Sequence, residues 1–363
     1  MKLRLVYRFS IFFVGAVLTA SIVVGSEENG SGLEPPYHVG YRVVDFDYQK
    51  AGEPQTLTVA IWYPTAEQPR TYTYGGPTDG KVAVDAAPQV ENGPYPLLIF
   101  SHGYGGSGLS AVFFTEVLAA HGWIVVCPDH HDEQSSVRVR TGQQDFDRFG
   151  LRRSVKEIAA SDPHRRGKYL YRLDEMKLVM HRLLKSEQMG PLIDRRRMAV
   201  GGHSFGGFTA LGVAGAIEHR HKQRIKAILL FSSGAGGYLF TDEELAAVRI
   251  PSMLFIGERE RRQRRGSNTM LELSAKIYSN FSPPKYFVEI QDGNHFSFNN
   301  RFEDNARNKL LSGTDEQYDV IRRYAIAFLQ HHVVGEPGFE QVLQQRDSRL
   351  SQFKSKSALV ASE

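Results

Sequence analysis

The chain has 363 residues, of which 41% are hydrophobic, and its 44 lysines and arginines against 40 aspartates and glutamates give a formal net charge of +4. A chain of this length and composition can bury a large core. The small positive excess is too weak to indicate a nucleic-acid-binding protein, but it is compatible with contact to an anionic surface.

The first 25 residues differ from the rest of the chain. Lys2, Arg4 and Arg8 precede an uncharged apolar run that ends at Gly25, and polar residues follow. This order predicts a signal peptide over residues 1–25, and hence an exported protein that is secreted or periplasmic. The apolar run of about 17 residues is near the lower limit for crossing a bilayer, so an uncleaved membrane anchor is the alternative.

Cys127 is the only cysteine in the chain. An internal disulfide is therefore excluded. Because Cys127 lies in the apolar run 123–127, we expect it to be a buried small side chain and not a nucleophile.

The elements that follow can be taken in chain order. Residues 41–48 and 57–64 read as two strands joined near Gly52, which predicts an antiparallel hairpin. Residues 75–96 are rich in glycine, proline and aspartate and are typical of a surface loop. After that point short apolar runs alternate with helical patterns. The expected strands are 97–100, 123–127, 198–201, 227–231, 252–256 and 286–290, and the expected helices are 109–121, 173–184 and 314–329.

Strands that alternate with helices predict an α/β protein with a mostly parallel central sheet, flanked by helices on both faces and preceded by the antiparallel hairpin. We expect one catalytic domain over residues 35–335. Residues 133–169 are charged and loop-like, with short helices at most, and residues 336–363 are expected to form a loose polar tail. The loops at the carboxyl edge of such a sheet carry the functional residues.

Ser204 is the candidate nucleophile. It lies in Gly202-His203-Ser204-Phe205-Gly206, between an expected strand and a run of small residues that suits a helix. A Gly-x-Ser-x-Gly motif in this context forms a sharp turn that projects the serine above the sheet. The backbone N–H of Phe205, at the start of the helix, then points to where an oxyanion would form.

A serine hydroxyl needs a base, and the base needs a carboxylate that orients it. His295 follows the last expected strand in a turn-rich loop and is the candidate base. Glu260 and Glu258 follow the strand before it, which satisfies the chain order serine, acid, histidine. Glu260 is favoured as the acid, and Glu258 is the alternative. A solvated cluster of mutually paired charges is the other interpretation of this arginine-rich segment.

The loop at His102-Gly103-Tyr104-Gly105-Gly106 follows the first expected parallel strand. Its glycines allow a close approach of the backbone, so the N–H of Tyr104 is the candidate second oxyanion donor. The run from Asp129 to Asp132, which includes His130 and His131, could be interpreted as metal ligands. Adjacent residues seldom converge on one ion, so we expect hydrogen bonding or pocket lining there, and no metal site.

The Ser101–Gly106, Pro128–His130 and Gly202–Gly207 segments together resemble the α/β-hydrolase superfamily. Within it, residues 41–332 are similar to the plasma-type platelet-activating-factor acetylhydrolases and to dienelactone-hydrolase-like bacterial esterases. The resemblance implies Ser204 as nucleophile, His295 as base and the Tyr104 and Phe205 amides as oxyanion hole. In the animal acetylhydrolases the acid follows the strand after the nucleophile helix. Here that place reads Phe231-Ser232-Ser233-Gly234, without a carboxylate, and Glu260 occupies the acid position of the wider superfamily.

The sequence therefore predicts an exported serine hydrolase of short-chain carboxylic esters, which include sn-2 acyl groups of phospholipids. It needs no cofactor, and its partners are a small-molecule or lipid ester and, peripherally, a membrane or lipid surface. A polyester-cleaving, cutinase-like or dienelactone-hydrolase-like esterase is the alternative of the same fold. A hydrolase-like binding protein without activity and a membrane-anchored structural protein are the alternatives from other classes.

Overall fold

The computed structural model describes residues 35–357 except 51, 76–77, 144, 218–223, 262–268 and 301–310. The signal peptide expected over residues 1–25 lies outside the described residues. Within them, eleven strands form one sheet in the order β13-β12-β11-β10-β9-β5-β6-β2-β1-β4-β3, and β7 and β8 form a separate two-stranded ribbon. The strands from β6 to β12 in this order run parallel to one another, while β2 and β13 join them antiparallel.

The strands of the large sheet are β1 (His38–Lys50), β2 (Glu53–Thr65), β3 (Arg70–Gly75), β4 (Thr78–Val84), β5 (Tyr95–Ser101), β6 (Ile124–Pro128), β9 (Ile193–His203), β10 (Ile225–Phe231), β11 (Ser252–Gly257), β12 (Lys285–Ile290) and β13 (Leu350–Lys356). The ribbon consists of β7 (Val137–Arg138) and β8 (Gly142–Gln143). The α-helices are α1 (Val112–Ala120), α2 (Arg148–Ala159), α3 (Tyr171–Lys185), α4 (Phe205–Leu211), α5 (Gly236–Leu239), α6 (Asp242–Ala246), α7 (Met270–Asn280), α8 (Asp315–Leu329) and α9 (Glu340–Gln344).

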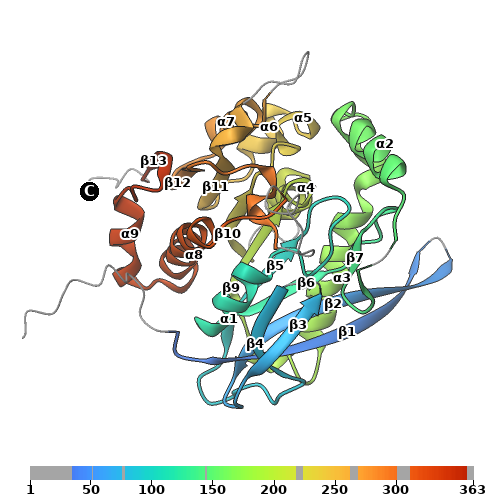
Figure 1. Cartoon of the computed structure of the whole chain (residues 1–363), viewed down its shortest axis with the longest axis vertical. Helices are drawn as coiled ribbons and strands as arrows, with labels where there is room; N and C mark the ends of the chain where they lie inside the picture. Colours follow the sequence, from blue (N-terminus) through green and yellow to red (C-terminus); the bar gives the residue numbers. More distant parts are fainter. Residues whose placement is uncertain are drawn as a thin grey trace, which may run out of the picture. The chain divides into compact units, whose positions relative to one another are not determined.

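Helices cover both faces of the sheet, and each face has its own apolar core (Figure 1). The core on one face is formed with α3, α4, α6 and α7, and it includes Met176 and Phe208. The core on the other face is formed with α1, α8 and α9, and it includes Phe114 and Phe328. All residues of β5, β6 and β11 are buried, as their unbroken apolar sequences require in a sheet that is covered twice.

The predicted fold class is confirmed. The opening hairpin is β1 and β2, which pair antiparallel from His38 to Lys50. The predicted strands from residue 97 to residue 290 correspond to β5, β6, β9, β10, β11 and β12, and the helices to α1, α3 and α8. Thr314 caps α8, because its side chain accepts a hydrogen bond from the Gln317 N–H. The Gln317 side chain in turn accepts one from the Thr314 N–H. Cys127 is buried, and burial raises the pKa of its thiol, so it is a packed side chain.

Three segments expected to be irregular contain regular structure. Within residues 75–96, β4 pairs with β1 and β3 because Val82 and Ala83 are buried, although the outward positions are polar. Within 133–169, α2 extends over twelve residues from its cap at Asp147. Within 336–363, β13 extends the sheet beside β12, where Leu350 is buried and the Phe353 ring packs on Tyr324. Their apolar residues are too sparse to give a strong periodic signal.

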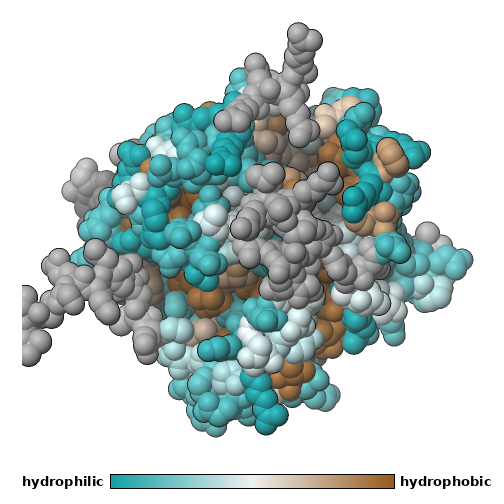
Figure 2. Space-filling model, viewed as in Figure 1, coloured by the Kyte–Doolittle hydropathy of each residue, from teal (hydrophilic) through white to brown (hydrophobic). Residues whose placement is uncertain are grey.

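No helix among the described residues is long and apolar enough to cross a membrane. The face drawn in Figure 2 is mostly hydrophilic, with apolar atoms gathered in small areas. One of these areas lies near α2, at the upper right of the view in Figure 1.

Candidate active site

The turn that carries Ser204 joins β9 to α4. Ser204 has φ 53° and ψ −118°, a strained conformation for a residue with a side chain. Gly202 and Gly206 make the turn possible, because an added Cβ would lie 2.2 Å from the Gly206 carbonyl oxygen in the first case and 1.9 Å from the Ser101 carbonyl oxygen in the second. The chain thus folds into the strand–turn–helix arrangement that the motif predicts, with Ser204 at the carboxyl edge of the sheet.

His295 lies directly beyond β12, in a 3₁₀ helix from His295 to Phe298 that Asn294 caps. Its Nε2 is 2.9 Å from Ser204 Oγ. The backbone of His295 is also held from the side of β9, because the Nε2–H of the buried His203 donates to the His295 carbonyl oxygen at 2.9 Å. Burial holds the pKa of His203 down at about 3, so this imidazole is neutral. The base is therefore placed between the nucleophile and a fixed, uncharged neighbour.

Glu260 lies in the 3₁₀ helix Glu258–Arg261 that follows β11. One carboxylate oxygen is 3.0 Å from His295 Nδ1, and the other accepts the Gly257 N–H at 2.8 Å. Glu258 instead accepts the N–H of Asp292 at 2.9 Å and does not face the imidazole. Of the two glutamates that the sequence left open, the structure brings Glu260 to the histidine.

The arginines around Glu260 have other partners. Arg259 pairs with Asp292 at 3.1 Å, and Arg261 pairs with the buried Glu289. Glu260 itself is buried, with 7% of its surface exposed. The geometry of these described residues therefore differs from a solvated cluster in which Glu260 pairs with its own arginine neighbours.

Sequence reasoning missed Ser232, which follows β10. Its hydroxyl donates to Glu260 Oε1 at 2.5 Å and lies 2.6 Å from His295 Nδ1. The only available signal was its place in the chain, at the strand end where the animal acetylhydrolases carry their acid. A serine there reads as the absence of a carboxylate, and nothing in the sequence indicates a contact with the base.

The other side of Ser204 is formed by the loop after β5. Gly103 lies so near that an added Cβ would be 3.2 Å from Ser204 Cβ and 3.2 Å from His203 Nδ1. This approach brings the backbone of Tyr104 beside the nucleophile. Phe205 begins α4 immediately after Ser204, and its ring packs edge-on against the Tyr104 ring with 5.9 Å between the centroids. The two expected oxyanion donors are thus neighbours of Ser204.

A buried ion pair supports this loop from the side of α3. The guanidinium of Arg172, which is fully buried on α3, donates to Asp132 at 2.6 Å and 2.9 Å, and to the His102 carbonyl oxygen at 2.8 Å. It also lies 5.0 Å over the Phe205 ring. Asp132 in turn accepts the Gly105 N–H at 3.2 Å. Burial alone would raise the pKa of Asp132, but the Arg172 charge and hydrogen bonds hold it below its usual range.

The residues from Asp129 to Asp132 form part of this support. Asp129 accepts the Gly108 and Val139 N–H groups, both at 2.8 Å. His130 contacts Ser101 Oγ at 2.8 Å and Glu175 at 2.7 Å, and Glu175 also contacts His131 at 2.8 Å. In the part of the chain that the structure describes, no group of histidine, cysteine, aspartate or glutamate residues has the arrangement of a metal site.

Arg172 and Glu175 were also missed from the sequence. The helix was recognised by its apolar spacing, and two charged residues between apolar ones are usually exposed. Their burial at 0% and 2% follows from partners on β5 and β6 loops that are distant in the chain.

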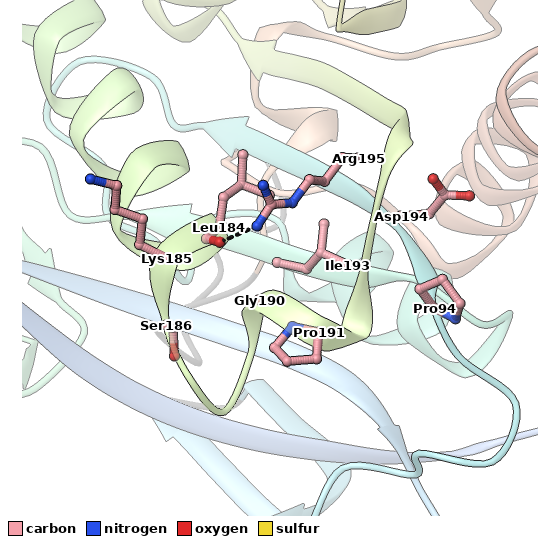
Figure 3. Close-up of a pocket in the computed structure, with 9 residues that line it drawn as sticks. All are labelled: Pro94, Leu184, Lys185, Ser186, Gly190, Pro191, Ile193, Asp194 and Arg195. Carbon is pink, nitrogen blue, oxygen red and sulfur yellow. Dashed lines mark hydrogen bonds between the residues drawn. The ribbon is translucent and has the colours of Figure 1, made fainter.

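A hollow of about 590 Å³ lies at the opposite edge of the sheet. Residues from the end of α3 and the start of β9 line it, and the Arg195 guanidinium points across it to the Leu184 carbonyl oxygen (Figure 3). Since β9 rises by ~3.3 Å per residue, the hollow is roughly 30 Å from Ser204 and does not belong to this site.

The geometry can be compared with known proteins. A ferulic acid esterase from Streptomyces cinnamoneus has a similar structure, with a TM-score of 0.65 and 20% identity over 88% of this chain and 96% of that one. The protein has the α/β-hydrolase fold. The chain also matches the family model described as platelet-activating factor acetylhydrolase, isoform II, over residues 77–150, a region that includes the Tyr104 loop.

Two curated relatives of this chain are platelet-activating factor acetylhydrolases. The protein from Cavia porcellus is 25% identical over an alignment of 323 positions that covers 78% of this chain and 71% of that protein. The protein from Bos taurus is 24% identical over an alignment of 281 positions that covers 68% of this chain and 59% of that one. The resemblance expected from the sequence is confirmed. These comparisons support carboxylic ester hydrolase activity.

Proposed function

We propose that this α/β-hydrolase is a serine hydrolase of carboxylic esters that works through an acyl-enzyme on Ser204. The observation that carries the proposal is the hydrogen-bonded series from Ser204 Oγ to His295 Nε2 at 2.9 Å and from His295 Nδ1 to Glu260 at 3.0 Å. A nucleophile, a base and an orienting carboxylate in this order are what acyl transfer to serine requires.

The reaction follows from these contacts. Ser204 Oγ attacks the ester carbonyl carbon while its proton passes to His295 Nε2, and the carbonyl electron pair moves to the oxygen. The N–H groups of Tyr104 and Phe205 stabilise this oxyanion. When the intermediate collapses, the alcohol leaves with the proton from His295, and the acyl group remains on Ser204. Water then enters by the same route, with His295 as base, and releases the acid. Glu260 orients the imidazole and stabilises its positive form.

The experiment is labelling by a fluorophosphonate together with hydrolysis of a short-chain nitrophenyl ester. The wild-type protein should react with the probe and turn over the ester. Ser204→Ala should remain folded, lose labelling and lose turnover by about 10³-fold or more, because no nucleophile is left for the base to activate. Turnover near the wild-type rate in folded Ser204→Ala, or no labelling of the wild type, would reject the proposal and favour a binding protein without activity.

For the substrate, we propose esters with a short acyl group, including the sn-2 acyl group of phospholipids. The support is the similarity to the two platelet-activating factor acetylhydrolases. A panel of nitrophenyl esters, phospholipids with short or long sn-2 chains, and polyester film tests this choice. Preference for short sn-2 chains is expected. Preference for the polyester would replace this substrate class but would leave the serine mechanism standing.

A lipid surface is the proposed peripheral partner, and α2 is the element that supports it. Phe149 is 79% exposed and stands on the outer face of α2 among Arg152, Arg153 and Lys156, which are also exposed. An apolar ring surrounded by cations suits an anionic lipid surface. Leu151 and Ser154, on the inner face of α2, lie against Gly105 and Tyr104. Sedimentation with anionic and with zwitterionic vesicles tests the proposal, and Phe149→Ser should weaken binding to the anionic ones.

Export is proposed from the pattern of residues 1–25 alone. The amino-terminal sequence of the mature protein tests it. A mature form that begins after Ala20 or Gly25 is expected, whereas an intact amino terminus in the membrane fraction would indicate an anchor.

A further inference from the structure

Ser232 has an unusual backbone conformation for a residue at the end of a covered strand. It follows β10 directly, its φ is 45°, and its side chain is fully buried. Its N–H donates to the Phe255 carbonyl oxygen of the neighbouring strand β11 at 2.8 Å. A non-glycine residue with positive φ is uncommon and indicates that the surroundings hold the side chain in a particular direction.

That direction is toward the base and the acid. The Ser232 hydroxyl is 2.6 Å from His295 Nδ1 and 2.5 Å from Glu260 Oε1, while Nδ1 and Oε1 are 3.0 Å apart. In the neutral imidazole Nε2 accepts the Ser204 proton, so Nδ1 carries the hydrogen. This Nδ1–H is directed at both oxygens, and the Ser232 hydroxyl donates its own hydrogen to the carboxylate.

We propose that Ser232 is a positioning residue of the proton-transfer series. The inference rests on the proposed function. Ser232 fixes Glu260 Oε1 and the Nδ1 edge of the imidazole relative to each other, and by that contact it keeps Nε2 directed at Ser204.

The strand geometry explains how Ser232 comes to lie beside the acid. β10 and β11 are parallel neighbours with Phe231 opposite Phe255, so Ser232 follows β10 next to the strand whose continuation carries Glu260.

Ser232→Ala in the otherwise unchanged protein tests the positioning role. Its kcat should fall about tenfold with KM nearly unchanged, and its unfolding midpoint should change little, because the contact acts on the base and not on substrate binding. An unchanged kcat overturns the inference. Wild-type turnover that depends on Ser204 shows in the same assays that the proposed function stands, so the two failures are distinguishable.

Discussion

The two sides of Ser204 are built from different kinds of contact. The side of the base and acid is assembled from side chains that follow β10, β11 and β12, and the His295 side chain remains 31% exposed. The side of the oxyanion loop is supported by the fully buried pair of Arg172 and Asp132. A proton must move on the first side, whereas the second must keep two N–H groups still. The difference teaches that the partly exposed group that must gain and lose a proton lies on one side of the nucleophile, and the fully buried ion pair lies on the other.

The largest expected effect is on the base and acid side. Glu260→Gln should lower kcat by about 10³- to 10⁴-fold, because the amide no longer stabilises the positive imidazole. Glu258→Gln should be mild, since Glu258 accepts the backbone N–H of Asp292, while the imidazole contacts Glu260. Steady-state kinetics of both folded variants measures the difference. The reverse order would reassign the acid to Glu258. If both variants stayed active, neither glutamate would be the acid.

The next effect concerns the backbone of the oxyanion loop. Gly103→Val should lower kcat by about 10²-fold or more, because its side chain would crowd Ser204 and His203 and move the Tyr104 N–H. Tyr104→Phe leaves the backbone in place and should change kcat only modestly. Rates of the two variants with one short-chain ester provide the measurement. A loss of two orders of magnitude in Tyr104→Phe would mean that the phenol itself is the donor.

A smaller effect is expected when the buried pair is altered. Arg172→Lys keeps a positive charge but cannot bond Asp132 and the His102 carbonyl oxygen together, so kcat should fall about tenfold or somewhat more with KM little changed. Arg166→Lys is the control, since Arg166 pairs with Glu244 and lies 5.1 Å over the Phe240 ring away from the loop. Equal losses of kcat in the two variants would contradict a specific role for Arg172.

The smallest effect is on stability against pH. Burial lowers the pKa of His102, His130 and His203 below 6.5, so acidification below that value protonates them in the unfolded chain first, and stability is lost. Asp129 opposes this, because burial raises its pKa to about 6 and the folded chain takes up its proton first. The net free energy of unfolding should fall by ~2–3 kcal/mol per pH unit below about pH 6.5, because three histidines are opposed by one aspartate.

Urea unfolding at several pH values measures this slope. Two of the three histidines lie on the oxyanion side, so His203→Gln should keep about half of the pH dependence. A flat or rising stability on acidification would show that the buried histidines do not remain neutral.

The sequence was most informative where one local pattern determines the structure. Six strands with unbroken or nearly unbroken apolar runs, the turn at Ser204 and the cap at Thr314 could be predicted, because each depends on residues that are close in the chain. Glu260 could be named but not separated from Glu258. The two residues differ in which one the 3₁₀ turn after β11 directs to the imidazole, and a one-dimensional pattern does not contain that direction.

The residues that sequence reasoning missed depend on contacts between distant segments. Ser232 acquires its place from the pairing of β10 with β11 and from a loop 63 residues away. Arg172 is buried because it meets carbonyl groups 69 and 70 residues away. A buried charge and a buried hydroxyl look like surface residues until the topology supplies their partners, so composition and spacing could not indicate them.

Strand β13 has a consequence for the solubility of truncated forms of the protein. It pairs with β12 over its whole length and presents Lys354 and Lys356 near the end of the outermost strand. Without it, the apolar strand β12 would offer an open row of backbone donors and acceptors to any other extended chain. A truncation before Leu350 should therefore lead to aggregation while the residues around Ser204 stay untouched. A stop codon just before Leu350 would act through solubility and not through chemistry.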